Sequence, residues 1–377
     1  MKRIYLMTPG PSPVPPLVRE ALGREMIHHR TEEFKEILTR VAKGLQYVFC
    51  TENPVLILAS SGTGAMEASV SNFLSPNEKV MVIDGGKFGE RWKEIAQSYQ
   101  LEVLEYKVEW GEAPDPDYVK DQLDKNPDIK AVFTTLCETS TGTVYDIERI
   151  AQLTKARDTI TVVDAISGLG QDKLLTDQWN VDVVVSGSQK GLMLPPGVSF
   201  ISVSQKAEKF MQRSTLAKYY FDLKKALKSY QKNDTPYTSA VSLIVGLDVS
   251  LRLIQEEGRE ARWQRFSKLA HATQEAVRAM GLSLFSRKPS NSVTAIVSPP
   301  GIKSSELVKK LRREYGLSIA GGQAEYKDKI FRIAHMGWIN EQDMIVCFSL
   351  LEKVMKELGY TSNVGASTQR LGEVLYA

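Results

Sequence analysis

The sequence predicts an α/β protein in which a large domain, built on a mostly parallel seven-stranded sheet sandwiched by helices, is followed by a smaller α+β domain. Two patterns predict this architecture. Between about residue 55 and residue 203, seven short apolar runs alternate with helical stretches; after about residue 239, longer helical patterns and a few further strands follow. The 377 residues exceed one ordinary domain of roughly 100 to 200 residues, so we expect a large domain over 17–255 and a small domain over 256–377.

Buried strands are indicated by seven runs that are rich in apolar and β-branched residues. In chain order they are VLILAS, KVMVID, LEVLEY, KAVFTT, TITVVDA, VDVVVSG and VSFISVS. The stretches Ala65–Leu74, Phe88–Tyr99 and Ile147–Arg157 have helical spacing, which gives a β-α-β order and a sheet covered on both faces. Ligands of such sheets bind at the carboxyl ends of the strands, where we therefore expect the functional residues.

The C-terminal part begins with two long helical patterns, Ser239–Glu257 and Arg259–Met280. A smaller α+β unit follows. Its expected elements are the strand SVTAIVS, a helix over Ser304–Tyr315, the strands LSIAGG and IFRIAHMG, and a last helix over Glu341–Leu358 that Gly359 ends. The chain after Tyr360 is polar and contains Gly and Ser, so we expect this tail to be loosely ordered.

The composition indicates an ordinary globular protein without nucleic-acid or membrane partners. Apolar residues make up 42% and charged residues 25%, and 48 basic against 45 acidic residues give a net charge of +3. Cys50, Cys137 and Cys347 have no paired spacing, which argues against a disulfide framework or a metal site. The Pro-rich start lacks the apolar core of a signal peptide, and no run is long enough to span a membrane, so we expect a cytoplasmic protein.

A lysine follows the run VDVVVSG almost directly, in the segment SGSQKGLMLPPG. Small residues precede Lys190, and a glycine and a Pro-Pro-Gly segment follow it. A lysine enclosed in a partly dry pocket loses proton affinity and can form an imine with a carbonyl compound. A solvated surface lysine is the commoner outcome for this residue type, and it is the alternative for Lys190 taken alone.

An aspartate, Asp164, ends another apolar run, TITVVDA. A carboxylate at that depth is costly unless it pairs with a cation, such as the protonated ring nitrogen of pyridoxal 5′-phosphate (PLP). The alternative is an aspartate that caps the following turn. Lys190 lies 26 residues further on, one β-α-β step away. Because consecutive parallel strands are commonly neighbours, both side chains can converge on one ligand.

A strand, a turn and a helix are predicted across LILASSGTGAMEASVSNFL. The turn contains Ser60, Ser61, Gly62, Thr63 and Gly64. Main-chain N–H groups at such a helix start, together with Ser and Thr hydroxyls, can bind a phosphate. The segment is neither a Walker A loop nor a GxGxxG fingerprint, and glycine turns are common before helices, so an ordinary turn is the alternative.

Together, these three segments resemble the class V aminotransferases among the fold-type I PLP enzymes, in particular the alanine–glyoxylate and serine–pyruvate group. The resemblance covers nearly the whole chain, through MTPGPSPVP, SSGTGAMEA, CETSTGTVYDI, VVDAISGLG, SGSQKGLMLPPG and IFRIAHMG. It implies the fold-type I architecture, PLP bound in the large domain, and a homodimer with shared active sites. The N-terminal segment 1–16 resembles the part of the family that lines the substrate entrance near the active site.

The resemblance also implies roles for individual residues. Lys190 would form the Schiff base and Asp164 would bind the pyridine nitrogen, which makes these two the expected catalytic pair. The other expected cofactor contacts are Gln189, Ser61, Gly62 and Thr63 at the phosphate, Thr139 at the ring oxygen, Phe88 stacked on the ring, and Thr238 from the partner subunit. Many relatives have tryptophan where this chain has Phe88, and the tyrosine expected a few residues before Thr238 is out of register, because Tyr237 is adjacent to it.

Arg332, in IFRIAHMG, would bind the α-carboxylate of the substrate. Guanidinium geometry supports this implied role, because it matches a carboxylate bidentately. A salt bridge within the small domain is the alternative for this arginine.

The reaction that the resemblance implies is ping-pong transfer of an amino group from alanine or serine to glyoxylate or pyruvate. A cysteine desulfurase or another lyase shares the fold, but a desulfurase needs a nucleophilic cysteine on a mobile loop. Cys347 lies in an apolar helical run, and Cys137 lies at an apolar strand end. A non-catalytic subunit is a further alternative, although it gives no reason for Lys190, Asp164 and Arg332 to occur together.

Overall fold

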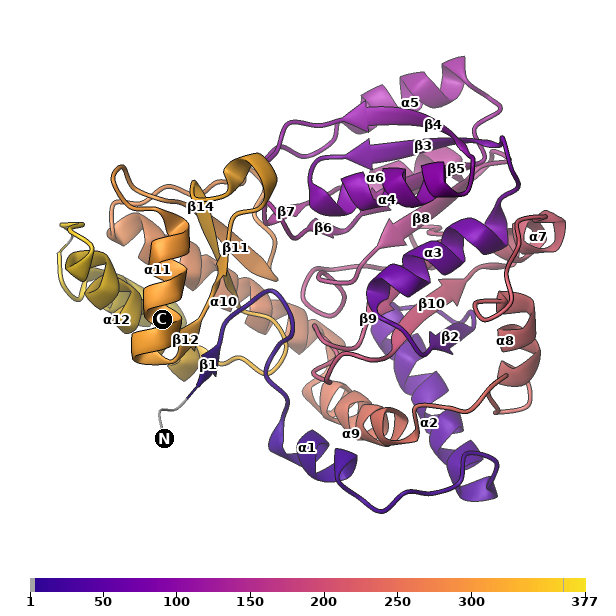
Figure 1. The fold of residues 1–377 in the computed structure, drawn as a ribbon, viewed down its shortest axis with the longest axis horizontal. Helices are drawn as coiled ribbons and strands as arrows, with labels where there is room; N and C mark the ends of the chain where they lie inside the picture. The colour runs from indigo at the N-terminus through magenta and orange to yellow at the C-terminus, as the bar shows by residue number, and fades with distance from the viewer. Residues whose placement is uncertain (1–3, 362) are drawn as a thin grey trace.

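The computed structural model describes residues 4–361 and 363–377, and Figure 1 shows that they form two parts. A large sheet with helices on both sides makes up one part. A smaller group of helices and short strands, drawn mostly in orange and yellow, makes up the other, and the indigo N-terminal segment runs from the smaller part to the larger one. The first three residues of the expected segment 1–16 lie outside the described residues.

The central sheet has seven strands in the order β2-β10-β9-β8-β5-β3-β4. They are β2 (Val55–Leu58), β3 (Lys79–Asp84), β4 (Glu102–Lys107), β5 (Ala131–Thr135), β8 (Ile160–Asp164), β9 (Val183–Gly187) and β10 (Ser199–Val203). β10 runs antiparallel to its neighbours β2 and β9, and the other pairings are parallel. Each predicted run forms one of these strands, so the prediction of a mostly parallel seven-stranded sheet is confirmed.

Apolar side chains from the strands enter cores on both faces of the sheet. In β3, for example, Val80 and Val82 pack in one core, and Met81 and Ile83 pack in the other. One face is covered by α1 (Pro16–Leu22), α2 (Glu32–Phe49), α5 (Pro116–Lys125), α6 (Ile147–Thr154) and α9 (Val241–Glu257). The opposite face is covered by α3 (Gly62–Phe73), α4 (Lys87–Ser98), α7 (Gln205–Arg213) and α8 (Leu223–Tyr230). The sheet is therefore covered on both faces, as the sequence pattern predicted.

The smaller part is built around a three-stranded antiparallel sheet in the order β11-β14-β13. Its strands are β11 (Val293–Val297), β13 (Ala320–Gly321) and β14 (Ile330–Ala334), and its helices are α10 (Arg259–Ala279), α11 (Ser304–Lys310), α12 (Glu341–Glu357) and α13 (Ala366–Leu375). They enclose a core that includes Phe266, Phe331 and Phe348. The helix expected over 304–315 continues beyond α11 as a wider π-helical turn, Leu311–Tyr315.

The N-terminal segment is attached to the smaller part by main-chain bonds. β1 (Tyr5–Leu6) pairs in parallel with β12 (Leu317–Ser318), which comprises the first two residues of the predicted strand LSIAGG. The N–H of Ala334 then donates to the carbonyl oxygen of Met7 at 2.9 Å. The chain therefore reaches α1 in the larger part only after it has passed the end of β14.

The C-terminal tail differs from the expectation of loose order, because its residues form α13. Glu352 of α12 accepts hydrogen bonds from the N–H of Gly365 and from the N–H and hydroxyl of Ser367, at 2.7, 2.8 and 2.5 Å. Leu371 and Leu375 pack in the core of the smaller part, where α13 lies against α10. Leu371, Val374 and Leu375 form an apolar stripe of only about one turn, so the pattern in the sequence is short, and the stability of this helix depends on the surface that receives it. Among the described residues, no helix is long and apolar enough to cross a membrane.

Candidate active site

Asp164 and Lys190 lie at the carboxyl ends of two neighbouring strands, at the same edge of the central sheet. β8 ends at Asp164 and β9 ends at Gly187, and the two strands pair in parallel with Asp164 opposite Val185. Parallel strands have their carboxyl ends at one edge of a sheet. The structure therefore brings the lysine and the aspartate to one site.

The amine of Lys190 is enclosed by the protein. Its residue is 7% exposed, and its Nζ donates a hydrogen bond to the carbonyl oxygen of Pro9 in the N-terminal segment. Burial lowers the pKa of Lys190 to about 8, although the negative charge of Asp164 opposes this shift. Part of the amine is therefore unprotonated close to neutral pH, as a nucleophilic or basic lysine requires. Lys190 is not the solvated surface lysine of the alternative interpretation.

Asp164 is also buried, at 4% exposure, and its Oδ1 accepts a hydrogen bond from the N–H of Ile166 at 2.8 Å. Burial raises the pKa of Asp164 to about 7. The charge of Glu138 raises this pKa further, whereas the bond from Ile166 and the positive charges of Lys190 and Arg91 lower it. The turn-capping interpretation is thus correct for Oδ1. Within the described part of the chain, Oδ2 accepts no hydrogen bond and Asp164 has no ion-pair partner, so a cationic ligand would have an acceptor here.

Glu138 connects this edge of the sheet with the start of α4. It lies in a hairpin of β6 (Cys137–Glu138) and β7 (Thr143–Val144) and is fully buried. Its carboxylate accepts hydrogen bonds from the N–H groups of Phe88 and Gly89, both at 3.1 Å, and from the N–H and hydroxyl of Ser140. A carboxylate at this position satisfies free N–H groups in the first turn of α4 and complements the helix dipole. The half-buried Phe88 is thereby fixed by its own main chain.

The turn before α3 approaches the segment that follows Asp164. Ser61 is the N-cap residue of α3, and it is exposed in the single chain. A Cβ atom added to Gly62 would lie 2.3 Å from the side chain of Ile166, so the close approach requires glycine. Thr63 accepts a hydrogen bond from Nη1 of Arg91 at 3.3 Å. The structure therefore brings the predicted phosphate-binding turn to the same site.

Gln189 and Thr139 contribute polar atoms from two further directions. Oε1 of Gln189 is buried and has no hydrogen-bond partner among the described residues. It lies close to the turn before α3, because a Cβ atom added to Gly187 would be 3.1 Å from this oxygen and 3.6 Å from the nitrogen of Gly62. The hydroxyl of Thr139 donates to that of Ser167 at 2.6 Å, in the segment after Asp164.

Arg332 occupies the middle strand of the small sheet, between Ala295 and Ala320. Its Nη1 donates to the carbonyl oxygen of Thr139 at 2.7 Å, and its Nε and Nη2 donate to that of Gly321 at 3.1 and 2.8 Å. An arginine has five N–H donors, so one remains on each terminal nitrogen. No described carboxylate pairs with Arg332, which is not the salt bridge of the alternative interpretation. Burial lowers its pKa to about 10, and the group is still charged at neutral pH.

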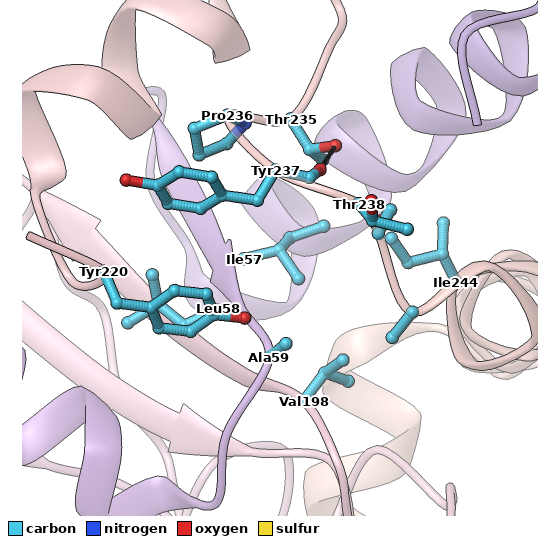
Figure 2. A pocket seen from close by; sticks show the side chains of 12 residues that line it. Ile57, Leu58, Ala59, Val198, Tyr220, Thr235, Pro236, Tyr237, Thr238 and Ile244 are labelled. Carbon is cyan, nitrogen blue, oxygen red and sulfur yellow. Dashed lines mark hydrogen bonds between the residues drawn. The ribbon is translucent and has the colours of Figure 1, made fainter.

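Thr238 lies apart from these residues within one chain. Figure 2 shows it in a pocket that Ala59, Tyr220 and Tyr237 also line. The rings of Tyr220 and Tyr237 stack with their centroids 5.2 Å apart, and Thr238 is exposed beside them. Neither Lys190 nor Asp164 is among the residues that line this pocket. The structure of a single chain thus does not place Thr238 at the site.

Sequence reasoning missed two residues that the structure places here, Arg91 and Glu138, whereas Pro9 belongs to the N-terminal segment 1–16 that was expected near the site. A signal was available for Arg91, because it follows Phe88 by three positions and such pairs share a helix face. Its guanidinium carbon is 4.9 Å from the centroid of the Phe88 ring. Glu138 immediately precedes Thr139, but nothing in its neighbourhood in the sequence indicates that it reaches α4. The contact of Pro9 is set by the path of the N-terminal segment.

The assembled site combines four kinds of group: a partly neutral amine, a buried carboxylate, a guanidinium with free N–H donors, and the N–H groups of a helix start. The carboxylate can bind a cationic ring nitrogen, and the helix start can bind a phosphate. The guanidinium can bind the carboxylate of an amino acid while the amine reacts with a carbonyl group. This combination suits chemistry on a small amino acid.

Comparisons with known proteins agree with this interpretation. The family described as Aminotransferase class-V matches residues 4–336. A protein of Synechococcus sp. (strain PCC 6716) named soluble hydrogenase, small subunit, is 42% identical over an alignment that covers 99% of this chain and 98% of that protein. The serine–glyoxylate aminotransferase of Methylorubrum extorquens is 33% identical, with 98% and 96% covered. The crystal structure of ureidoglycine–glyoxylate aminotransferase from Bacillus subtilis has a TM-score of 0.96 at 26% identity, with 100% and 99% covered.

Proposed function

The chain belongs to the class V aminotransferases and transfers amino groups, and from this premise we propose that it does so with PLP bound at Lys190. We further propose alanine or serine as the amino donor and glyoxylate or pyruvate as the acceptor, in a ping-pong order. The names of two similar proteins support serine as a donor and glyoxylate as an acceptor, because serine and glyoxylate occur in one name and glyoxylate occurs in the other.

One observation carries the proposal: the buried amine of Lys190 and the buried carboxylate of Asp164 lie at adjacent strand ends, and burial moves the pKa of each group toward 7. PLP has a group for each of them, an aldehyde for Lys190 and a protonated pyridine nitrogen for Asp164. The unpartnered Oε1 of Gln189 and the turn before α3 add polar groups on the side where a phosphate would be bound. The residues present therefore fit this cofactor.

The proposed contacts divide among the parts of PLP. Asp164 would hold the ring nitrogen, Thr139 the ring oxygen, and Phe88 one face of the ring. The phosphate would be held by Ser61, Gly62, Thr63 and Gln189. Thr238 would come from a partner subunit in a homodimer, which is consistent with its exposure and with that of Ser61 in the single chain.

When bound, PLP supplies an aldehyde that takes up the amino group and a ring that withdraws electrons from Cα. The chain supplies binding and proton transfer. Lys190, with a pKa near 8, is suited to accept the proton from Cα and to return it at the position required for the product. Asp164 keeps a proton on the ring nitrogen by placing a negative charge next to it.

Substrate orientation is assigned to Arg332. Its guanidinium donates hydrogen bonds to the carbonyl oxygens of Thr139 and Gly321, and these bonds fix the orientation of the group. The two remaining terminal N–H groups therefore have fixed directions, although the arginine side chain itself is flexible. A carboxylate bound by this fork would be held at the opposite end of the amino acid from Lys190. Because the carboxylate is anchored at Arg332, the α-amino group and Cα of the substrate are held close to Lys190.

The decisive experiment measures the visible absorbance of the purified protein with PLP, then adds alanine or serine without any acceptor. We expect the visible band to disappear as one equivalent of 2-oxo acid is released from the donor. The band should return when glyoxylate or pyruvate is added. The Lys190→Ala protein should give neither the band nor turnover, whereas the exposed Lys155→Ala protein should match the wild type. A Lys190→Ala protein that retains the band and turns over would overturn the proposal.

Desulfuration is a weaker candidate because the cysteines are unsuited to nucleophilic attack. Burial raises the pKa values of Cys137 and Cys347 to about 12, and it also raises the pKa of Cys50. Each thiol is therefore less readily ionised than a free cysteine, and the thiolate is the nucleophile. Formation of alanine and persulfide from cysteine without an acceptor would reverse this ranking.

A non-catalytic subunit is a second candidate, since one relative is named as the small subunit of a soluble hydrogenase. Such a role gives no reason for Lys190, Asp164 and Arg332 to be assembled with free acceptor and donor atoms. The absorbance experiment also decides this point. A protein that binds no PLP and leaves every donor unchanged would favour the non-catalytic role.

A further inference from the structure

The turn that follows Lys190 is held by side chains from three distant segments. The carbonyl oxygens of residues 190, 191 and 192 accept hydrogen bonds from the hydroxyl of Ser12, Nη2 of Arg262 and the hydroxyl of Ser250, at 2.8, 2.8 and 2.6 Å. Ser12 belongs to the N-terminal segment, Arg262 to α10 and Ser250 to α9. Three consecutive main-chain groups beside the reactive lysine are thus each fixed from elsewhere in the fold.

Arg262 differs from the two serines because it is a charged side chain with only 2% exposure. Its Nη1 pairs with Glu257 at 2.7 Å, and the same carboxylate pairs with Nε of Arg265 at 2.6 Å. We call Glu257, Arg262 and Arg265 the Glu257 cluster. Burial lowers the pKa of Arg262 to about 10, which leaves it charged at neutral pH.

Glu257 balances that charge. Burial raises the pKa of Glu257, but the bonds from Arg265 and Arg262 outweigh it, and the net pKa is lowered. Desolvating charged groups costs free energy that apolar side chains would not cost. Stability alone is therefore a poor explanation of the Glu257 cluster, and a positional requirement explains it better.

The cluster reaches a second functional segment. Nη1 of Arg265 donates to the carbonyl oxygen of Ile339 at 3.0 Å, in the segment between β14, which carries Arg332, and α12. Gly337 of that segment lies directly against the lysine turn, since an added Cβ atom would be 3.2 Å from the carbonyl oxygen of Lys190. A continuous series of bonds therefore runs from the turn of Lys190 to the chain that follows Arg332.

We propose that Arg262 is a positioning residue for amino-group transfer, which holds the turn of Lys190 at a fixed place relative to the segment that follows Arg332. The inference rests on the proposed function, in which Lys190 acts at one end of the amino acid and Arg332 binds the other. The spacing of these two groups must match the length of an α-amino acid. A shift of about 1 Å in such an arrangement can lower the rate about 100-fold.

The test compares the Arg262→Met, Arg262→Lys and Glu352→Ala holoenzymes. Glu352 binds the start of α13, and its hydrogen bonds to residues 365 and 367 do not involve the turn of Lys190. Its variant therefore controls for a loss of stability in the smaller part. For each protein, kcat and KM for the amino donor are measured, together with the pH at which the visible band changes and the melting temperature. A purely structural role would change the melting temperature alone.

The expected result is a fall in kcat of about 100-fold for Arg262→Met, with a displaced pH midpoint of the visible band. Arg262→Lys, which keeps one charged donor, should recover part of kcat. Glu352→Ala should keep the wild-type kcat and midpoint despite its lower melting temperature. Wild-type kcat and midpoint in the Arg262→Met protein would overturn the inference. If that protein does not fold, an Arg262→Lys protein with wild-type values overturns it instead.

The two proposals fail in different ways. A wild-type protein that gives no visible band with PLP contradicts the proposed function itself. A wild-type protein that gives the band and turns over, together with Arg262 variants that match it, contradicts only the positioning role.

Discussion

The amine of Lys190 donates a hydrogen bond to the main-chain carbonyl oxygen of Pro9, so the N-terminal segment lies directly on the residue proposed to bind the cofactor. The next residue, Gly10, has a φ of +96°, and a Cβ atom added there would be 2.4 Å from Cε of Lys190. The segment and the lysine therefore define each other's position.

Replacing Gly10 by alanine should displace Lys190. The new methyl group meets the lysine stem, and a left-handed backbone costs alanine about 1 to 2 kcal/mol. We expect weaker PLP binding and at least about a tenfold loss of kcat, since placement of the amine sets the rate. Gly301→Ala is a matched control, because Gly301 has a φ of +85° with no atom near an added Cβ. Equal effects of the two substitutions on kcat would contradict this prediction.

Replacing Arg332 by lysine should raise KM for the amino donor. Lysine cannot bind a carboxylate through two parallel N–H groups, and hydrogen bonds to charged groups contribute about 1.5 to 3 kcal/mol. An increase in KM of about 10- to 100-fold is therefore expected. Steady-state kinetics over a range of donor concentrations measures it, with the exposed Arg287→Lys as control. An unchanged KM would show that Arg332 does not bind the substrate carboxylate.

The apo protein should become less stable as Asp164 ionises. Its pKa is about 7 when folded, against an ordinary value of 3.8. The folded state therefore retains a proton that the unfolded chain releases, and the resulting stabilisation is complete below about pH 4 and lost as the pH rises through about 7. It amounts to about 4 kcal/mol at most. Urea unfolding at several pH values should show this loss in the wild type and not in Asp164→Asn; parallel curves would refute the raised pKa.

Replacing Glu352 by alanine should detach α13. Three hydrogen bonds to a buried carboxylate are lost, and the freed N–H and hydroxyl groups of residues 365 and 367 lose their partner. The free energy of unfolding should fall by about 2 kcal/mol. Glu373→Ala, an exposed change on α13 itself, should have little effect. Hydrogen exchange of residues 366–375 provides the local measurement, and protection equal to the wild type would contradict the assigned role.

Much of the fold could be predicted because buried parallel strands are apolar throughout and therefore conspicuous. All seven strands of the central sheet coincide with the predicted runs, and the family was identified correctly from SGSQKGLMLPPG and VVDAISGLG. The tail was predicted wrongly, since α13 depends on a carboxylate of α12 and on the core that receives two leucines. A helix whose stability comes from its docking surface leaves only a weak pattern in its own residues.

The sequence by itself determined the strands, the order of the elements and the chemical groups at the strand ends, because these depend on local periodicity and on the parallel topology. Only the tertiary structure decided which groups meet: that Pro9 contacts Lys190, that Glu138 holds the start of α4, and that Arg262 binds the turn beside the lysine. Contacts between residues far apart in the chain depend on how the elements pack, both within the larger part and between the two parts. No local pattern of residues encodes that packing.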